Sequence, residues 1–245
     1  MLFSFKPKTR FIDLLDGFVD IHNHILPSID DGADTVEDSI NLIDNLTEIG
    51  ISHFIPTPHT IADVHPNSPQ TITVARKKLE AALKNKGIAS PIKNVSSEYM
   101  MDSSLIQLIQ DNNILPLKDN YVLVEMSYLQ PPINLEEILF EITNSGWIPV
   151  LAHPERYNFY GGVLPPYQNL KKLGCLFQLN MLSLGNYYGK AVNRTATELL
   201  KSDFYDFIGS DVHHMRHIEN LKDLKLKGDT GIYQKLIENT KYRFS

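Results

Sequence analysis

Short apolar runs rich in β-branched and aromatic residues recur along this chain, and longer amphipathic stretches separate most of them. The apolar runs predict seven strands, at residues 18–22, 52–57, 92–96, 121–126, 147–152, 175–180 and 206–209. Apolar positions three or four apart predict helices at residues 36–49, 70–86, 105–109, 135–142, 170–173, 192–200 and 221–237. Because strands that alternate with helices are typical of parallel strands joined by crossovers, the pattern predicts an α/β fold.

The chain shows no internal repeat and no linker longer than a loop, which predicts one domain over residues 1–245. Residues 1–17 precede the first predicted strand and are expected to form a short N-terminal arm, solvated at its start. The arm lacks the apolar core of a signal peptide. No stretch approaches the ~18 consecutive apolar residues of a membrane span.

The amino-acid composition of the chain limits the classes of protein to which it can belong. The chain is 42% hydrophobic and 21% charged, as expected for a globular protein, and its net charge of −6 argues against a nucleic-acid-binding surface. The single cysteine, Cys175, excludes an internal disulfide and suits a reducing compartment. We therefore expect a cytoplasmic protein that does not insert into membranes or bind nucleic acid.

Ionisable side chains stand at or just past the ends of successive predicted strands. They are His22, His24, His59, Glu98, Glu125, His153, Asp211 and His213. The carboxyl ends of parallel strands converge on one face of a barrel, whereas in an open sheet they would not all meet. This placement favours a closed or nearly closed seven-stranded barrel.

The first of these groups is His22-Asn-His24, whose two imidazoles project to the same side of an extended chain. Asp30 and Asp31 follow in a loop that could return an oxygen ligand to them. A hydrogen-bonded structural pair is the alternative for the two histidines. Glu125 is the most telling member of the set, because a charge inside an apolar strand is rarely buried unpaired. For His153 the alternative is a core histidine, and for Asp211 a helix cap.

Imidazole and carboxylate groups together suit Zn, Mn or Fe. The full set of candidate ligands is His22, His24, Asp31, His59, Glu98, Glu125, His153, Asp211 and His213. Nine ligands exceed what one ion needs and fit two or three ions that share bridging carboxylates. Glu98 and Asp211 are the natural central ligands.

Several motifs resemble the PHP (polymerase and histidinol phosphatase) superfamily. They are Asp20-Ile-His22-Asn-His24, Thr57-Pro-His59, Glu98, Leu151-Ala-His153-Pro-Glu-Arg156-Tyr157 and Gly209-Ser-Asp211-Val-His213. Within it, Ile-Leu-Pro-Ser-Ile-Asp-Asp-Gly and Ala-His-Pro-Glu-Arg are similar to the bacterial PHP-type protein-tyrosine phosphatases linked to capsule and exopolysaccharide production. The likeness runs from about residue 18 to about residue 213.

The resemblance implies a distorted seven-stranded (β/α) TIM-like barrel with three divalent ions, manganese being favoured over iron, cobalt or zinc. His22, His24, Glu98 and Asp211 would hold the first ion. Glu98, Glu125 and His153 would hold the second, and Asp31, His59 and His213 the third. Asp30 could take the place of Asp31.

The implied activity is metal-dependent hydrolysis of phosphomonoesters, most simply of phosphotyrosine, by a hydroxide that bridges metal ions. Its catalytic residues would include Glu98 and Asp211, with Arg156 and Arg216 binding phosphate. The implied partner is a phosphotyrosine protein, such as a bacterial tyrosine-kinase tail. Tyr128 and Tyr157 could stack on the substrate ring or only pack the loops.

Three alternatives stay open at this point. The enzyme could act on a small molecule such as histidinol phosphate, it could be a phosphodiesterase, or the chain could be a non-catalytic metal-binding scaffold. Cys175 lies in an apolar run without the basic Cys-x5-Arg loop of cysteine phosphatases, so we expect a buried structural thiol. The oligomeric state is not determined by the sequence.

Overall fold

The computed structural model describes residues 9–226 and 229–245, and eight of its strands run parallel in two ladders. The larger ladder has the order β4-β5-β6-β7-β8-β9, and the smaller one pairs β2 with β3. These strands are β2 (Phe18–Asp20), β3 (Ile51–Phe54), β4 (His59–Thr60), β5 (Glu98–Met100), β6 (Tyr121–Glu125), β7 (Ile148–Ala152), β8 (Leu176–Asn180) and β9 (Phe207–Gly209). The predicted α/β class and parallel sheet are confirmed.

Backbone hydrogen bonds outside the ladders join the two sheets into a ring. The Asp211 N–H donates to the His22 carbonyl at 2.7 Å, which connects the chain after β9 to the chain after β2. On the other side, the Ser96 N–H donates to the Pro56 carbonyl at 2.9 Å, which connects the chain after β3 to the chain before β5. Since β3 and β4 belong to one extended run, the ring is a distorted barrel of seven strand runs.

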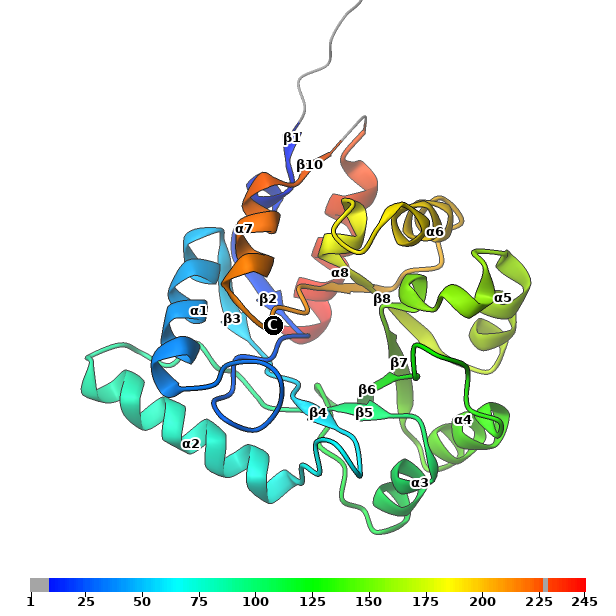
Figure 1. The fold of residues 1–245 in the computed structure, drawn as a ribbon, viewed down its shortest axis with the longest axis horizontal. Helices are drawn as coiled ribbons and strands as arrows, with labels where there is room; N and C mark the ends of the chain where they lie inside the picture. Colours follow the sequence, from blue (N-terminus) through cyan, green and yellow to red (C-terminus); the bar gives the residue numbers. More distant parts are fainter. Residues whose placement is uncertain (1–8, 227–228) are drawn as a thin grey trace, which may run out of the picture.

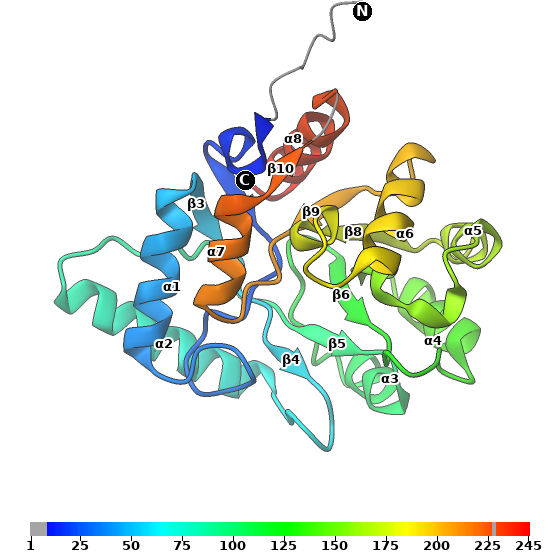
Figure 2. The same cartoon turned by 45° about the horizontal axis from the view of Figure 1, so that its top comes forward.

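The helices lie outside this ring (Figures 1 and 2), with α1 and α2 on one side and α3 to α6 around the other. They are α1 (Val36–Glu48), α2 (Pro69–Asn85), α3 (Ser103–Gln110), α4 (Leu135–Asn144), α5 (Leu164–Lys172), α6 (Lys190–Lys201), α7 (Met215–Asp223) and α8 (Gly231–Phe244). The start of α1 is set by a capping box, in which the Thr35 hydroxyl accepts from the Asp38 N–H and the Asp38 carboxylate accepts from the Thr35 N–H.

Two boundaries differ from the sequence-based predictions. The third strand was expected at residues 92–96, but this stretch makes only one bridge, between Ile92 and Phe54, and the ladder begins at Glu98. Two backbone hydrogen bonds still join this segment to the chain around β3, from the Lys93 N–H to the Phe54 carbonyl and from the Ser96 N–H to the Pro56 carbonyl. On its other side, the Asn94 side chain takes the place of ladder bonds by donating to the carbonyls of Pro116 and Leu117. Glu98 therefore opens its strand and does not follow it.

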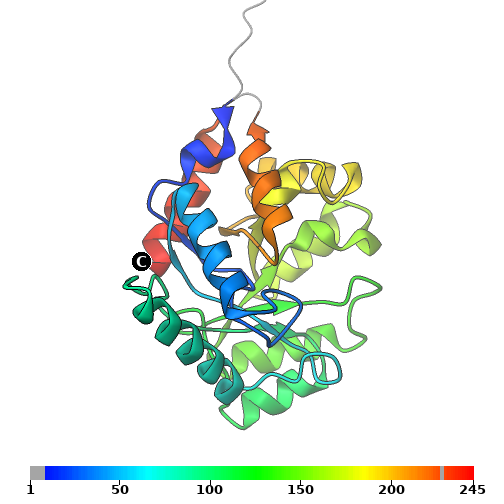
Figure 3. The ribbon, with the colours of Figure 1, turned by 60° about the vertical axis from the view of Figure 1, so that its left-hand side comes forward.

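The helix predicted over residues 221–237 is wrong, because the structure has two helices there, α7 and α8. After α7 the chain forms the short strand β10 (Lys225–Leu226), which pairs antiparallel with β1 (Thr9–Arg10). Both strands lie at the same end of the molecule in Figures 1 to 3. Leu226 is buried in β10, so its apolar character reflects burial in a strand and not the face of a helix.

The N-terminal arm is only partly as predicted. Residues 1–8 lie outside the described range, and residues 9–17 are only partly solvated, since Arg10 and Asp13 are exposed but the apolar side chains turn inward. Phe11 and Leu15 are fully buried, and the Phe11 N–H donates to the Leu224 carbonyl at 2.8 Å. The η1 turn (Phe11–Leu14) thus covers the side of α7 before the chain enters β2.

The alternation along β6 shows how the barrel places a carboxylate in its centre. Tyr121 and Leu123 pack in an interior cluster with residues of β7 and β9, whereas Val122 and Val124 belong to the cluster that includes the helices. Because strand side chains alternate between faces, Glu125 shares the interior face and emerges at the carboxyl end of the strand. Among the residues that the structure describes, no helix is both long and apolar enough to cross a membrane.

Candidate metal centre

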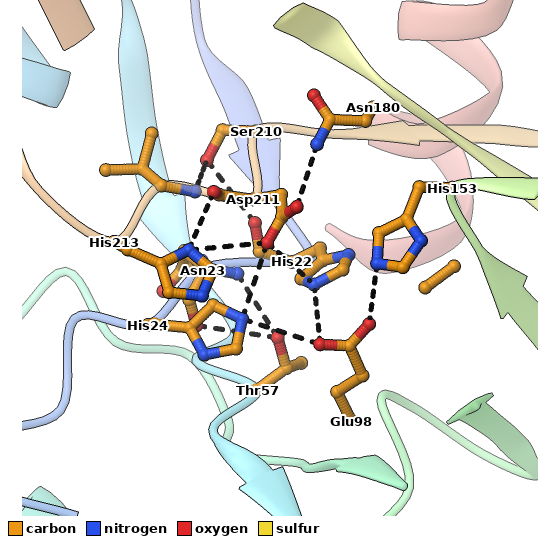
Figure 4. A network of polar contacts seen from close by, with 12 residues as sticks. His22, Asn23, His24, Thr57, Glu98, His153, Asn180, Ser210, Asp211 and His213 are labelled. Atoms are coloured by element: carbon orange, nitrogen blue, oxygen red, sulfur yellow. Dashed lines mark hydrogen bonds and ion pairs between the residues drawn. The ribbon is translucent and has the colours of Figure 1, made fainter. Parts of the chain in front are cut away.

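Side chains from six strands and the segments that adjoin them meet in one largely buried cluster, and Figure 4 shows Glu98 facing His22 and His153 there. The nine predicted ligands are all brought together there, each within 3.5 Å of another: His22, His24, Asp31, His59, Glu98, Glu125, His153, Asp211 and His213. The barrel explains this convergence, since parallel strands end on one face.

The first group consists of His22, His24, Glu98 and Asp211. The Nε2 atom of His22 lies 3.1 Å from Glu98 Oε2 and 3.3 Å from Asp211 Oδ1. His24 Nε2 lies 3.5 Å from the same two oxygens. All four side chains are buried, and their four candidate ligand atoms lie within 4.8 Å of one another. This spacing suits four donor atoms around one ion.

The other ring nitrogen of each histidine has its own partner. His24 Nδ1 lies 2.7 Å from Asp30 Oδ2, and since the pKa of Asp30 is lowered, its carboxylate accepts and Nδ1 donates. Burial opposes that shift of Asp30, but the charge of His24 outweighs it. His22 Nδ1 donates in the same way to Gln178 Oε1 at 2.8 Å. When the ring is neutral, each Nε2 therefore presents a lone pair to the cluster, which is the arrangement that metal-binding histidines adopt.

Acceptor atoms consequently face acceptor atoms. Within the described residues, the following buried atoms have no hydrogen-bond partner: His22 Nε2, His24 Nε2, His59 Nδ1, both carboxylate oxygens of Glu98, and Glu125 Oε1. Buried polar groups are almost always satisfied, so such a concentration requires a positive charge between them. Divalent cations with oxygen and nitrogen ligands fit this donor set.

The pKa values in the cluster also indicate that its acceptor atoms favour positive charge between them. Burial disfavours the charged form of His22, but Glu98 and Asp211 outweigh it and raise its pKa to about 9. Burial likewise opposes ionisation of Glu98, yet His22 and His59 hold its pKa well below its usual value. A metal ion would replace these protons, because only the neutral imidazole ligates.

The second group is centred on Glu98 and Glu125. His153 Nε2 lies 3.0 Å from Glu98 Oε1, but the ligand atoms that gather around Glu98 and Glu125 come from His59 and not from His153, with His59 Nδ1 2.8 Å from Glu125 Oε1. Burial and the charge of Glu98 raise the pKa of Glu125 to about 7. Burial lowers that of His153 to about 4, which keeps its ring neutral.

The third group lies nearest to solvent. Asp31 Oδ1 lies 3.5 Å from His59 Nε2 and 3.4 Å from His213 Nε2, and the side chain of Asp31 is 59% exposed. The sequence left Asp30 and Asp31 as alternatives. In the structure Asp31 faces the histidines of this group, whereas Asp30 turns inward to orient His24. The two aspartates thus occupy different positions.

The backbone at the site is held in unusual conformations. His153 and Asp211 have φ of 37° and 54°, in the left-handed region that non-glycine residues rarely enter. A Cβ at Gly32 would lie 2.0 Å from the His24 carbonyl oxygen, so the turn that returns Asp31 to the cluster needs glycine. Ser210 ties the barrel together beneath Asp211, since its hydroxyl donates to Asp20 at 2.6 Å.

Arg156 lies above the first group. Its Nη1 donates to Asp211 Oδ2 at 2.7 Å, and its guanidinium carbon lies 4.7 Å from the Tyr128 ring centre and 4.2 Å from that of Tyr188. Burial opposes the charge of Arg156, but the negative charge of Asp211 helps to raise its pKa above the usual value. The expectation that Arg156 reaches over the cluster agrees with this position. Glu155, its neighbour in the sequence, is not its partner, because Glu155 is buried and accepts from the Tyr205 hydroxyl.

The other predicted substrate-binding residues differ in position. Tyr128 is 46% exposed, and its hydroxyl lies 3.4 Å from His153 Nε2, so it stands at the edge of the site. Tyr157 is buried, with its hydroxyl bonded to the Met126 N–H and the Ala152 carbonyl, so its ring cannot receive a ligand. Arg216 is exposed in the first turn of α7, and no side-chain ion pair links it to the cluster within the described residues.

Sequence reasoning missed the residues that support the cluster. Asn180 donates to Asp211 Oδ2 at 2.8 Å and to the Tyr188 hydroxyl at 3.2 Å, and Gln178 orients His22. Both lie in β8, the one strand for which no ionisable end residue was found. Two amides on the same face of an apolar strand are a signal that could have indicated them.

Comparisons with known proteins agree with this geometry. Residues 18–224 match the protein-family model described as "Capsular polysaccharide synthesis, CpsB/CapC". The chain is 29% identical over 199 residues to tyrosine-protein phosphatase YwqE of Bacillus subtilis, covering 81% of this chain and 78% of that protein. It is 26% identical to the putative tyrosine-protein phosphatase CapC of Staphylococcus aureus, with 80% and 76% covered.

Similarity extends to a solved structure. The fold superimposes with a TM-score of 0.79 and 26% identity on a chain from crystal structures of YwqE from Bacillus subtilis and CpsB from Streptococcus pneumoniae. The match covers 92% of this chain and 94% of the other. Those two proteins are described as unique metal-dependent tyrosine phosphatases.

Proposed function

The chain belongs to the CpsB/CapC capsular polysaccharide synthesis family, and from this membership we propose that it is a metal-dependent protein-tyrosine phosphatase linked to capsule production. The observation that carries the proposal is the buried cluster in which unpartnered imidazole and carboxylate acceptors face one another. We further propose three divalent ions, with manganese favoured, and a phosphotyrosine protein such as a bacterial tyrosine-kinase tail as the substrate.

Each proposed metal position has its own donors. His22, His24, Glu98 and Asp211 would hold the first ion, with Glu98 shared with the second. Glu125 and His153 would complete the second, next to His59. Asp31, His59 and His213 would hold the third. When bound, such ions supply a Lewis acid that activates water and neutralises the charge of the phosphate.

The protein's own residues then orient the substrate. Arg156 has five N–H donors, of which the contacts within the described residues use one, on Asp211. The rings of Tyr128 and Tyr188 on either side keep its planar guanidinium from rotating, so its free donors point in fixed directions. A fixed fork of this kind suits the oxygens of a phosphate.

Replacing Arg156 by alanine is expected to lower kcat/KM for a phosphotyrosine peptide by roughly 10- to 150-fold. The estimate follows from ~1.5–3 kcal/mol for a hydrogen bond to a charged group. Arg156→Lys should recover part of the loss, because a point charge cannot supply the fork. Steady-state kinetics on protein of measured metal content would test this.

Arg243 offers a matched control, since its guanidinium carbon also lies over a tyrosine ring, at 5.2 Å from the centre of Tyr121, but outside the site. Arg243→Ala should keep full activity. An Arg156→Ala enzyme with the parent's kcat/KM would show that the arginine serves only to pair with Asp211.

The substrate class is tested by a panel of phosphoesters under one metal condition. We expect higher kcat/KM for phosphotyrosine peptides than for phosphoserine peptides, histidinol phosphate or a phosphodiester. The half-exposed Tyr128 ring beside Arg156 is the structural reason, because an aromatic substrate can stack on it. A preference for histidinol phosphate would support the small-molecule alternative instead.

A further inference from the structure

Exposed apolar side chains are concentrated on one side of the site. Eight large apolar side chains are exposed in the described part of the chain, and four of them, Tyr128, Leu129, Ile133 and Phe140, fall within residues 128–140. Leu129 is 89% exposed and Ile133 is 99% exposed. This segment follows β6 and includes the first half of α4, which lies on the outside of the barrel (Figure 1). Exposed apolar patches on soluble proteins often mark interaction sites.

The apolar segment is continuous with the phosphate-binding edge of the site. Tyr128 contacts both Arg156 and His153, and Leu129 is the next residue, one Cα–Cα step of ~3.8 Å away. A substrate whose phosphate reaches Arg156 would therefore place its neighbouring residues near Leu129. An extended peptide covers ~3.3 Å per residue, so side chains within a few positions of the phosphotyrosine reach this segment.

Local structure prevents the segment from burying its own apolar side chains. Pro131 and Pro132 fix the backbone between Leu129 and Ile133. Helix α4 already buries Ile138, Leu139 and Ile142 against the barrel, so no inward face remains for the loop. A surface held in this way loses little conformational freedom when a partner binds.

The charges of the segment indicate what kind of partner fits. Residues 127–145 contain three carboxylates, Glu136, Glu137 and Glu141, and no lysine or arginine. Glu136 and Glu137 are exposed. An anionic lipid surface would be repelled by these charges, whereas a polypeptide with basic and apolar side chains would be attracted.

We propose that Leu129 and Ile133, together with Glu136 and Glu137, form a docking surface for the polypeptide around the phosphotyrosine, and that it selects flanking residues that are apolar and basic. The inference rests on the proposed function and assigns recognition of the substrate polypeptide to this segment. Recognition of the polypeptide is thus separate from hydrolysis of the phosphate.

The kinetic test compares two phosphotyrosine peptides of equal length, one with leucine and lysine flanks and one with serine and glutamate flanks. We expect Leu129→Ser to lower kcat/KM for the first peptide about tenfold, which corresponds to ~1.4 kcal/mol, and to leave p-nitrophenyl phosphate hydrolysis unchanged. Tyr242→Ser is the matched control, because Tyr242 is 87% exposed on α8. Glu136→Lys with Glu137→Lys should reverse the preference between the peptides.

A binding measurement keeps the test independent of catalysis. Fluorescence anisotropy with the leucine- and lysine-flanked peptide, carrying a non-hydrolysable phosphonate, should show about tenfold weaker binding to Leu129→Ser than to the parent and to Tyr242→Ser. Equal affinities would overturn the proposed docking surface. It would also be overturned if Leu129→Ser changed only the binding of the protein to anionic vesicles, or only its self-association. If the parent hydrolyses no phosphotyrosine substrate yet binding depends on Leu129, the proposed activity fails and the docking surface stands.

Discussion

Removing divalent metal with a chelator is expected to abolish phosphotyrosine hydrolysis, with a loss of at least ~1000-fold in kcat. The reason is that nine candidate ligands meet at the site, whereas Cys175, the one cysteine of the chain, lies outside them, so we assign the attack on the phosphate to a metal-activated water. Metal ions supply several kcal/mol of transition-state stabilisation, and ~4 kcal/mol corresponds to ~1000-fold in rate. Activity measured against bound metal, with Mn²⁺, Fe²⁺ or Co²⁺ added back, would test this.

Cys175 provides the control for a different mechanism. It is buried just before β8, and burial raises the pKa of its thiol to about 12, so it does not form the thiolate that a cysteine phosphatase needs. Cys175→Ser should therefore retain activity and the same dependence on metal. Undiminished turnover in metal-free, folded protein would contradict the metal-dependent mechanism.

The site could be predicted from the sequence where a local pattern determines which way a side chain points. Glu125 ends an otherwise apolar strand. It lies on the same face of the strand as Tyr121 and Leu123, so its side chain points into the barrel. His22 and His24 are similarly close in sequence, so their convergence depends on few backbone angles. The alternation of strands and helices then brings such ends together on one face.

Other features could not be predicted because they depend on contacts between distant segments. Tyr188 reaches Arg156 from a loop that follows another strand, and no periodicity links the two. Tyr157 lies beside Arg156 in sequence, yet its side chain turns into the core, where its hydroxyl satisfies the Met126 N–H. Residue type alone does not distinguish a tyrosine that faces a ligand from one that caps a buried strand end.

The predicted boundaries of one strand and one helix were wrong for a related reason. Residues 92–96 do pair with the chain around β3, but Pro56 and Pro58 have no N–H to donate, so a continuous ladder begins only at Glu98. Residues 221–237 contain helix-like spacing, but Leu226 is buried by pairing with the N-terminal segment. In both places tertiary contacts override the local pattern.

Glu98→Gln is expected to reduce both the number of metal ions bound and turnover, the latter by more than ~100-fold. Glu98 faces three histidines with its two oxygens, at 3.0 Å from His153, 3.1 Å from His22 and 3.2 Å from His59. Loss of a residue that merely orients a metal ligand costs ~10–100-fold, so a central ligand should cost more. An amide replaces one anionic oxygen by an NH₂ group that cannot ligate a hard cation.

Glu155→Gln is the matched control, because Glu155 is equally buried but lies outside the cluster, where it accepts from the Asn180 N–H at 3.0 Å and bonds to Tyr205. Burial raises the pKa of Glu155, so its surroundings disfavour its charge, and glutamine keeps its shape without that charge. Glu155→Gln should therefore keep the parent's metal content, whereas Glu98→Gln should lose it while remaining folded. Elemental analysis of both purified variants distinguishes the outcomes, and full metal content in Glu98→Gln would place the metal site elsewhere.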